Sequence, residues 1–458
     1  MTAGNNGRVW TPAPRTHEMI TAPPVEPNGG VLPAVVLDVD LSDALPVVPA
    51  VAADGRRVRQ AWMLVRLFTE PIGTVLTDVP GNGLRPADLA RAIQAGLGGT
   101  LAPKLAELGL TTMPIDGIVP ATEPAFLTRR REVLARAPHI TVVVCTRERP
   151  AALARCLDSL RAQWYPSYRV LVVDNAPVTG ATAGVVRAAA RHRRVEYLLE
   201  KTPGLSFARN AAVAAAPGEI LAWIDDDEVA DPYWLAEVAR ALADHPEADV
   251  VSGVIVPAEL ETRAQLWFEQ FGGHSKGRGF TPAVFSPATA HVQSPLYPLP
   301  PFGTGANMTF RPGVIERIGG FDVALGAGTP AMGSEDTLAF TQVLVAGGTI
   351  VYQPTAVTRH YHRRDLDGLE KQMAGYGAGL TAAYTSLLLG RPGLLWPLIK
   401  LAPGALRDLT GSDSLRVSTL REDFPRELLK ANRRGMLAGP RAYLKGRLAA
   451  RAKLRGSR

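Results

Sequence analysis

Apolar and polar residues follow one another along this chain in a pattern that predicts mixed α/β structure. From residue 139 onwards, short β-branched runs of strand length take turns with longer segments of helical period. The predicted strands are Ile140–Val144, Arg169–Val173, Val195–Leu199, Glu219–Ile224 and Val250–Val256. The predicted helices begin near Pro150, Ala183, Leu205 and Asp231. This strict alternation indicates a doubly wound α/β sheet, mainly parallel, with helices on both faces.

The residues before this sheet predict a small α/β unit of their own. Its expected strands are Val35–Leu41, Ala61–Leu67 and Gly73–Val79, followed by a helix over Pro86–Leu108. Residues 114–138 are typical of a linker with a charged centre. Residues 1–30 are rich in Pro, Gly, Asn and Thr and contain no apolar segment like that of a signal peptide, so we expect them to be disordered.

Positive charge is concentrated at the C-terminal end. The formal net charge is +7, but Lys430–Arg458 contains ten Lys and Arg and no Asp or Glu, so the remainder carries −3. A nucleic-acid-binding fold would carry its charge over a folded face, so we expect no nucleic-acid partner. The preceding apolar stretch, Leu380–Leu406, is broken by charges and prolines and does not reach the roughly 18–20 residues of a spanning helix. Apolar surface followed by basic residues fits an anionic membrane surface as a partner, and it fits equally a helical subdomain packed on the core; the two readings are compatible.

These patterns divide the chain into five expected segments. They are a disordered N-terminus (1–30), an accessory α/β domain with its linker (31–137), the doubly wound domain (138–365), a helical and membrane-interfacial extension (366–429) and a basic tail (430–458). The two cysteines, Cys145 and Cys156, fit buried, reduced thiols of a cytoplasmic protein, which could lie peripherally on the inner face of the plasma membrane.

Three predicted strands end in polar groups. Thr146–Pro150, Asp174–Asn175 and Asp225–Glu228 each follow a strand directly. In a doubly wound sheet these strand ends share one edge, which is where ligands bind. One acidic strand end would mean little, because Asp commonly caps the next helix. Three on one edge predict a binding site.

The acidic cluster after Ile224 is the strongest local signal. Adjacent aspartates repel one another unless a cation or hydrogen bonds compensate the charge. A hard divalent cation accepts carboxylate oxygens and leaves positions for phosphates. The alternative is a solvated acidic turn with Asp231 capping the following helix.

Taken in order, these motifs resemble the family 2 glycosyltransferases, in particular an actinobacterial type with an extra N-terminal domain. The resemblance covers roughly Ile140–Arg364. It rests on the strands that end in Cys145–Pro150 and Asp174–Asn175, the segment Pro203–Asn210, the DxD-like Asp225–Glu228, the glycine segment Gly303–Arg311, Ile318–Asp322, the acidic pair in Gly333–Asp336, and Arg359–His362. The resemblance implies a GT-A fold, a nucleotide diphosphate sugar as donor and a divalent cation, Mn²⁺ or Mg²⁺.

The resemblance also assigns donor-binding residues. Asp174 is expected to accept a hydrogen bond from the base, and Asp227, with Asp225 and His360, to hold the cation; His362 stays a candidate. The remaining donor contacts are expected from Thr146, Arg147, Glu148, Arg209, Asp225, Asp226, Gly305 and Asn307. Each has a simpler reading: Asp174–Asn175 as a helix-capping turn, the arginines as surface residues, the glycines as an ordinary turn and the histidines as a polar strand end.

Asp336 is the expected catalytic base by resemblance, with Glu335 orienting the acceptor or the loop. A carboxylate against the attacking hydroxyl accelerates such a reaction roughly 10²–10⁴-fold. The alternative is that Ser334–Asp336 only begins a helix, with Ser334 as N-cap. The two readings are compatible.

The function expected from these residues is non-processive, inverting transfer of a sugar to a hydroxyl acceptor, such as a cell-envelope saccharide or lipid-linked saccharide. No Gln-x-x-Arg-Trp motif follows the acidic pair, which argues against processive synthesis. Two alternatives stay open. One is a non-catalytic GT-A scaffold that binds a nucleotide sugar or saccharide. The other is a nucleotidyltransferase, but that class carries a glycine-rich loop with a lysine after its first strand, and Thr146–Pro150 has no such loop.

Overall fold

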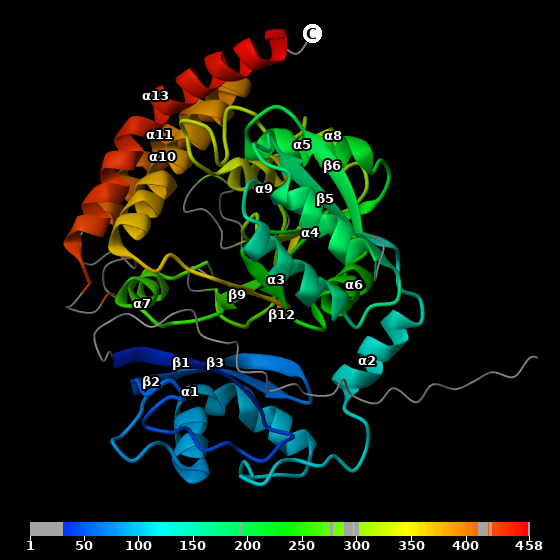
Figure 1. Cartoon of the computed structure of the whole chain (residues 1–458), viewed down its shortest axis with the longest axis vertical. Coiled ribbons are helices and arrows are strands. Elements are labelled where there is room, and N and C mark those ends of the chain that lie inside the picture. Colours follow the sequence, from blue (N-terminus) through cyan, green and yellow to red (C-terminus); the bar gives the residue numbers. More distant parts are fainter. Residues whose placement is uncertain are drawn as a thin grey trace, which may run out of the picture.

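The structure is a computed structural model of the whole chain, and it describes residues 31–191, 195–274, 278–287, 296, 302–410, 420 and 424–456. A small N-terminal unit lies below a large α/β domain, and long C-terminal helices flank that domain on one side (Figure 1). The expected disorder of residues 1–30 lies outside the described residues.

The N-terminal unit is a three-stranded sheet covered by one long helix. Its elements are β1 (Val31–Asp40), β2 (Arg57–Leu67), β3 (Glu70–Asp78) and α1 (Pro86–Glu107). Strands β2 and β3 form a hairpin, and β1 pairs parallel to β2. The strands and the helix that the sequence predicted are all present. Alternation along β2 divides its side chains: Met63 and Val65 face α1, whereas Trp62 and Leu64 join the core of the large domain.

Residues 114–138, predicted as a linker, include a helix, α2 (Ala125–Leu134). Arg130 explains why this charged segment is ordered. Its guanidinium is buried, donates to Glu237 at 2.8 Å and lies over the ring of Tyr233. The segment therefore fastens the N-terminal unit to the large domain.

The large domain is built on a nine-stranded sheet. Its path runs β10-β12-β9-β11-β7-β4-β5-β6, with β8 paired to β12. The strands are β4 (Ile140–Thr146), β5 (Tyr168–Asn175), β6 (Val195–Glu200), β7 (Ile220–Ile224), β8 (Glu228–Ala230), β9 (Val250–Pro257), β10 (Ala283–Phe285), β11 (Asn307–Phe310) and β12 (Ile350–His360). Neighbours β4 to β7 are parallel, as are β9 and β12, so the expected doubly wound sheet is confirmed. Strand β11 runs antiparallel between β7 and β9, which makes the sheet mixed.

Helices cover both faces of this sheet. One apolar layer joins alternate residues of β4 and β5 to α3 (Pro150–Arg161), α4 (Ala181–Ala190) and α6 (Trp234–Asp244). The opposite layer packs the other residues of these strands against α5 (Leu205–Ala215) and α9 (Glu335–Val345). Two shorter helices, α7 (Arg263–Gln270) and α8 (Val314–Arg317), lie in the connections. Cys145 and Cys156 are free thiols within these layers, and burial raises the pKa of both.

The C-terminal extension is helical, as predicted. It contains α10 (Leu366–Gly390), a short 3-10 helix (Pro392–Leu394), α11 (Leu395–Thr410) and α13 (Arg426–Gly456). The expected boundary at residue 430 falls inside α13. Helices α10 and α13 approach each other closely enough for their backbones to touch. A Cβ on Gly435 would lie only 2.0 Å from the carbonyl oxygen of Ala374, so this position requires glycine. Over the part of the chain that the structure describes, no helix is long and apolar enough to cross a membrane.

Candidate active site

The polar groups predicted at the strand ends do meet at one edge of the sheet. Thr146 ends β4 and pairs with Asp174 at the end of β5. The aspartates Asp225–Asp227 follow β7, and His360 ends β12. The site therefore draws on four strands that are well separated in sequence.

The structure distinguishes the three aspartates that the sequence could not divide. Asp226 is buried, accepts from the Thr146 hydroxyl at 2.6 Å, and faces Arg149 at 3.1 Å. Burial raises the pKa of Asp226 to about 6, with the charge of Asp227 adding to the effect. Asp226 thus holds the loop after β4 in place, and its expected contact with the donor stays a prediction.

Asp227 and Asp225 are the more open carboxylates. Asp227 Oδ2 lies 2.9 Å from Arg149 Nη1, and Asp227 Oδ1 lies 3.5 Å from His360 Nε2. Burial would raise the pKa of Asp227, but His360 and then Arg149 outweigh it and hold that pKa well below its usual range. Asp225, with 39% of its side chain exposed, lies 3.8 Å from Arg209, and burial raises its pKa.

Arg209 connects the aspartates to the acidic pair. This α5 residue is 2% exposed, and its Nη1 lies 2.9 Å from Glu335 Oε1. Its Nη2 donates to the carbonyl oxygen of Gly305 at 3.2 Å. The guanidinium is therefore held by Glu335 and Gly305, and the donor contact expected of Arg209 stays a prediction. Burial raises the pKa of Glu335 to about 7, against the opposing charge of Arg209.

Asp336 lies in the first turn of α9 and faces the glycine segment. Its Oδ2 accepts from the Gly305 backbone N–H at 2.5 Å, and its Oδ1 accepts from that of Thr337 at 2.6 Å. Ser334 occupies the N-cap position of α9 with a φ of 67°, but its side chain makes no capping hydrogen bond. The simpler reading, a helix start capped by Ser334, is thus only half right.

Gly305 is glycine for a steric reason. A Cβ at this position would lie 2.7 Å from Arg209 Nη2 and 2.9 Å from Asp336 Cβ. Asn307, two residues on, is the first residue of strand β11. Its side chain is buried, donates to the carbonyl oxygens of Val254 and Ala356, and accepts from Trp234. These three hydrogen bonds tie Asn307 to β9, β12 and helix α6, and the donor contact expected of Asn307 stays a prediction.

Asp174 is fully buried at the base end of the site. Its Oδ2 accepts from the Tyr197 hydroxyl at 2.8 Å, and Oδ1 accepts no hydrogen bond from another described residue. Burial raises the pKa of Asp174. Tyr197 was not predicted as a site residue from the sequence. It lies on β6, a different strand from Asp174, and no motif surrounds it.

Glu148 and Arg147 lie on the loop after β4. Glu148 adopts a φ of 54° and accepts from the backbone N–H groups of Val178 and Thr179 at 2.8 and 2.9 Å. Its carboxylate therefore holds two loops together beside Asp174. Arg147 is exposed next to it.

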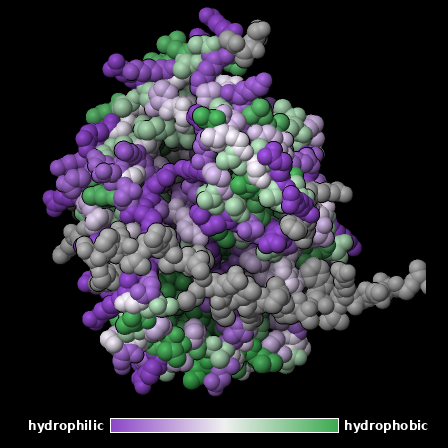
Figure 2. Space-filling model, viewed as in Figure 1, coloured by the Kyte–Doolittle hydropathy of each residue, from purple (hydrophilic) through white to green (hydrophobic). Residues whose placement is uncertain are grey.

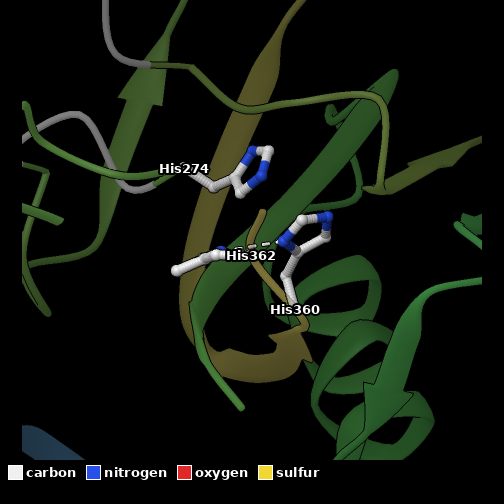
Figure 3. Close-up of side chains that lie close together, drawn as sticks. All are labelled: His274, His360 and His362. Atoms are coloured by element: carbon white, nitrogen blue, oxygen red, sulfur yellow. Dashed lines mark hydrogen bonds between the residues drawn. The ribbon is translucent and has the colours of Figure 1, made fainter. Parts of the chain in front are cut away.

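Three histidines gather near the end of β12 (Figure 3), and one of them, His360, lies 3.5 Å from Asp227. One ligand atom from each of His274, His360 and His362 lies within 4.8 Å of the others. His360 and His362 face each other with Nδ1 atoms 2.8 Å apart, and His362 Nε2 lies 2.8 Å from Glu269 Oε1. Burial lowers the pKa of His362. His274 follows the glycine pair after α7, a position that no motif singled out.

The residues present fit a divalent cation. Carboxylate and imidazole donors together suit ions such as Mn²⁺ and Zn²⁺. With metal–ligand distances of about 2.1 Å, two donors of one ion can lie up to roughly 4.2 Å apart. The 3.5 Å separation of Asp227 Oδ1 and His360 Nε2 is within that range.

Comparison with known proteins identifies the sheet domain. Residues 141–319 match the family model described as glycosyl transferase family 2. The succinoglycan biosynthesis protein ExoM of Rhizobium meliloti is 30% identical over 224 residues, 48% of this chain and 65% of that protein. The pre-mycofactocin glycosyltransferase of Mycobacterium tuberculosis is 25% identical over 268 residues, 58% of this chain and 51% of that protein.

Other relatives are matched over smaller shares of their length. The O-antigen biosynthesis protein RfbC of Myxococcus xanthus is 27% identical over 58% of this chain, which spans 20% of that protein. Among solved structures, a mannosyltransferase from Pyrobaculum calidifontis in complex with GDP-Man and Mn²⁺ aligns over 71% of this chain and 81% of that chain, with a TM-score of 0.40 and 22% identity. The family match covers residues 141–319, which lie within the doubly wound sheet, so this part of the chain is a glycosyl transferase family 2 domain with a GT-A-like sheet.

Proposed function

We propose that this chain is a non-processive, inverting glycosyltransferase that moves a sugar from a nucleotide diphosphate to a hydroxyl acceptor. The observation that carries the proposal is the placement of two acidic groups on one edge of the sheet, joined by one buried arginine. Arg209 lies 2.9 Å from Glu335 and 3.8 Å from Asp225. Groups that act on the donor and on the acceptor would thus share one rigid support.

In this proposal the donor lies along the strand ends. Asp174 Oδ1 accepts from the base, since this buried oxygen has no hydrogen bond from a described residue. Asp225, Asp227 and His360 would hold a divalent cation, which supplies Lewis-acid stabilisation of the diphosphate leaving group. Arg149, at 2.9 Å from Asp227, adds positive charge at the same place.

Asp336 serves as the base on the acceptor side. Its two oxygens accept from the backbone N–H groups of Gly305 and Thr337, which hold the carboxylate in one orientation beside the glycine segment. The acceptor hydroxyl gives its proton to Asp336 as its oxygen attacks the anomeric carbon. Attack from the face opposite the leaving diphosphate inverts the configuration in a single displacement.

The C-terminal helices support an acceptor carried on an anionic membrane surface. Leu437, Leu444 and Leu448 are 85%, 50% and 66% exposed and lie seven and four residues apart, hence on one stripe of α13. This stripe is opposite the glycines that pack on α10. Arg441 and Arg451 flank the leucines, and in Figure 2 hydrophilic residues surround hydrophobic ones over these helices. Apolar residues ringed by Arg and Lys are typical of helices that lie in a membrane interface.

The same helices adjoin the acceptor side of the site. A Cβ on Gly379 of α10 would lie 2.6 Å from the hydroxyl of Ser334, next to the acidic pair.

Vesicle flotation tests the membrane proposal. Full-length protein should float with vesicles containing about one third phosphatidylglycerol and not with neutral ones, and L437S/L444S/L448S should stay at the bottom. A V47S/L76S control, which alters exposed apolar residues of the N-terminal unit, should float. Flotation of L437S/L444S/L448S with the anionic vesicles would contradict the membrane proposal.

Donor turnover tests the transferase proposal itself. A panel of UDP-, GDP- and TDP-sugars should yield nucleotide diphosphate from at least one donor with Mn²⁺ present, and EDTA should abolish release. Asp227→Ala should remove cation-dependent release, and Glu247→Ala, an exposed carboxylate away from the strand ends, should not. Release that is equal in Asp227→Ala and the parent would contradict the proposal.

A further inference from the structure

A line of hydrogen-bonding groups leads from helix α7 to Asp227. Glu269 Oε1 lies 2.8 Å from His362 Nε2. His362 Nδ1 lies 2.8 Å from His360 Nδ1, the contact drawn as a dashed line in Figure 3. His360 Nε2 lies 3.5 Å from Asp227 Oδ1.

We propose that Glu269 and His362 are positioning residues that fix the tautomer of His360. A carboxylate only accepts, so the proton between Glu269 and His362 belongs to His362 Nε2. A neutral His362 then has a bare Nδ1, which must accept from His360 Nδ1–H. A His360 that donates from Nδ1 keeps its lone pair on Nε2, free for a bound cation; without a cation, Nε2 can instead carry an N–H towards Asp227.

This arrangement leaves the lone pair of His360 Nε2 free to bind a cation beside Asp227. Because that cation is part of the proposed function, the inference rests on the proposed function. The opposite tautomer would direct an N–H at Asp227 and could not act as a ligand. Carboxylates hydrogen-bonded to metal-binding histidines act in this way in other metal sites, and their loss weakens metal binding roughly 10–100-fold. Here the orienting carboxylate acts through a second imidazole, two hydrogen bonds from His360.

The surrounding structure holds the line of groups in place. Helix α7 begins with a capping box between Thr262 and Gln265. Gln265 Nε2 also donates to the carbonyl oxygen of His362 at 3.3 Å, which ties the helix to the end of β12. The ring of Phe268 packs edge-on against that of His362, with centroids 4.7 Å apart.

The turn after α7 leaves room for the Glu269 carboxylate. Gly273 has a φ of 52°, and a Cβ at this position would lie 2.4 Å from Glu269 Oε1. The backbone therefore passes directly over the carboxylate. The next residue, His274, puts its ring against that of His360, with centroids 4.4 Å apart.

The tautomers can be read directly by NMR, without donor or acceptor. Long-range ¹H–¹⁵N spectra of full-length protein labelled with ¹⁵N-histidine and saturated with Mg²⁺, at pH 8, distinguish protonated from bare ring nitrogens. The chain has eight histidines, so single substitutions can assign the signals. We expect His360 protonated at Nδ1 and His362 at Nε2. A His360 ring protonated at Nε2 would overturn the proposal whether or not the protein transfers sugar.

Cation affinity provides the second readout, using Mn²⁺ alone and the EPR signal of the free ion. Glu269→Ala should weaken Mn²⁺ binding by roughly 10–100-fold. Glu269→Gln, which keeps an accepting oxygen, should restore part of the loss, and Glu247→Ala should change nothing. Unchanged Mn²⁺ binding in Glu269→Ala would contradict the proposal. So would loss of binding in His274→Asn alone, because the ion would then lie among the three imidazoles.

Discussion

The Arg209 guanidinium lies 2.9 Å from the Glu335 carboxylate, and the two side chains are 3% and 6% exposed. This buried pair stands between the aspartates after β7 and the helix that carries Asp336. Removing one partner of such a pair strands the other charge in the interior. Both sides of the proposed active site thus depend on one contact.

Glu335 gives the protein a measurable dependence of stability on pH. Burial raises the pKa of Glu335 to about 7, from an ordinary value of 4.5. The folded state therefore holds this proton between these two values and the unfolded state does not, so this contribution to stability is present below pH 4.5 and is lost as pH rises through about 7. The Tm of the parent minus that of Glu335→Gln should fall between pH 5 and 8. A difference that rises or stays flat would show that Glu335 is ionised throughout.

Gly305 should tolerate no side chain. Gly305→Ala places a Cβ against Arg209 and Asp336, so we expect a loss of roughly 1–3 kcal/mol in the free energy of unfolding and a large loss of donor turnover. Gly184→Ala is the matched control, since a Cβ there meets nothing within 4 Å inside helix α4. That control should be neutral or stabilising by up to about 1 kcal/mol in urea unfolding. Equal behaviour of the two variants would refute the steric argument.

Asp174 should set nucleotide affinity. Asp174→Ala removes the buried acceptor proposed for the base, and a lost charged hydrogen bond of about 1.5–3 kcal/mol corresponds to roughly 10–150-fold weaker binding. Tyr197→Phe removes the hydroxyl that donates to Asp174 Oδ2 and leaves Oδ1 in place, so its effect should be smaller. Isothermal titration with UDP and GDP measures both. Identical affinities of the parent and Asp174→Ala would place the base elsewhere.

Contacts between the N-terminal unit and the sheet domain should contribute to the free energy of unfolding of the sheet domain. Arg66 of β2 forms a buried ion pair with Asp231, which lies three residues before the first residue of α6, and Asp231 would lose this partner in Arg66→Ala. Breaking a buried pair costs about 3–5 kcal/mol. Arg59→Ala, on the same strand at an exposed position, should change the free energy of unfolding by less than about 0.5 kcal/mol. Comparable urea midpoints for the two variants would mean that the unit folds independently of the sheet domain.

Much of the fold could be predicted because its periodicity is local. Strands β4, β5 and β7 are continuous apolar runs, and each ends in a polar group that the sheet carries to one edge. Strand β11 escaped prediction as an antiparallel strand because its four residues show no pattern of their own.

The site was predictable only where a motif marked it. Asp174, Asp227, Asp336 and His360 stand in motifs and do meet. Tyr197, Glu269 and His274 matter through contacts made over long sequence distances, which no local pattern encodes. Asn307 lies in a motif, and its side chain also makes hydrogen bonds to β9, β12 and helix α6 that no local pattern predicts.

Asp336→Asn tests the central claim, that the carboxylate held by Gly305 and Thr337 removes the acceptor proton. The asparagine keeps the shape of the site and cannot take up the proton. With the donor found by screening and Mn²⁺ present, nucleotide affinity should stay within about twofold, whereas transfer should fall roughly 10²–10⁴-fold. Transfer at the parent rate by Asp336→Asn would contradict the account.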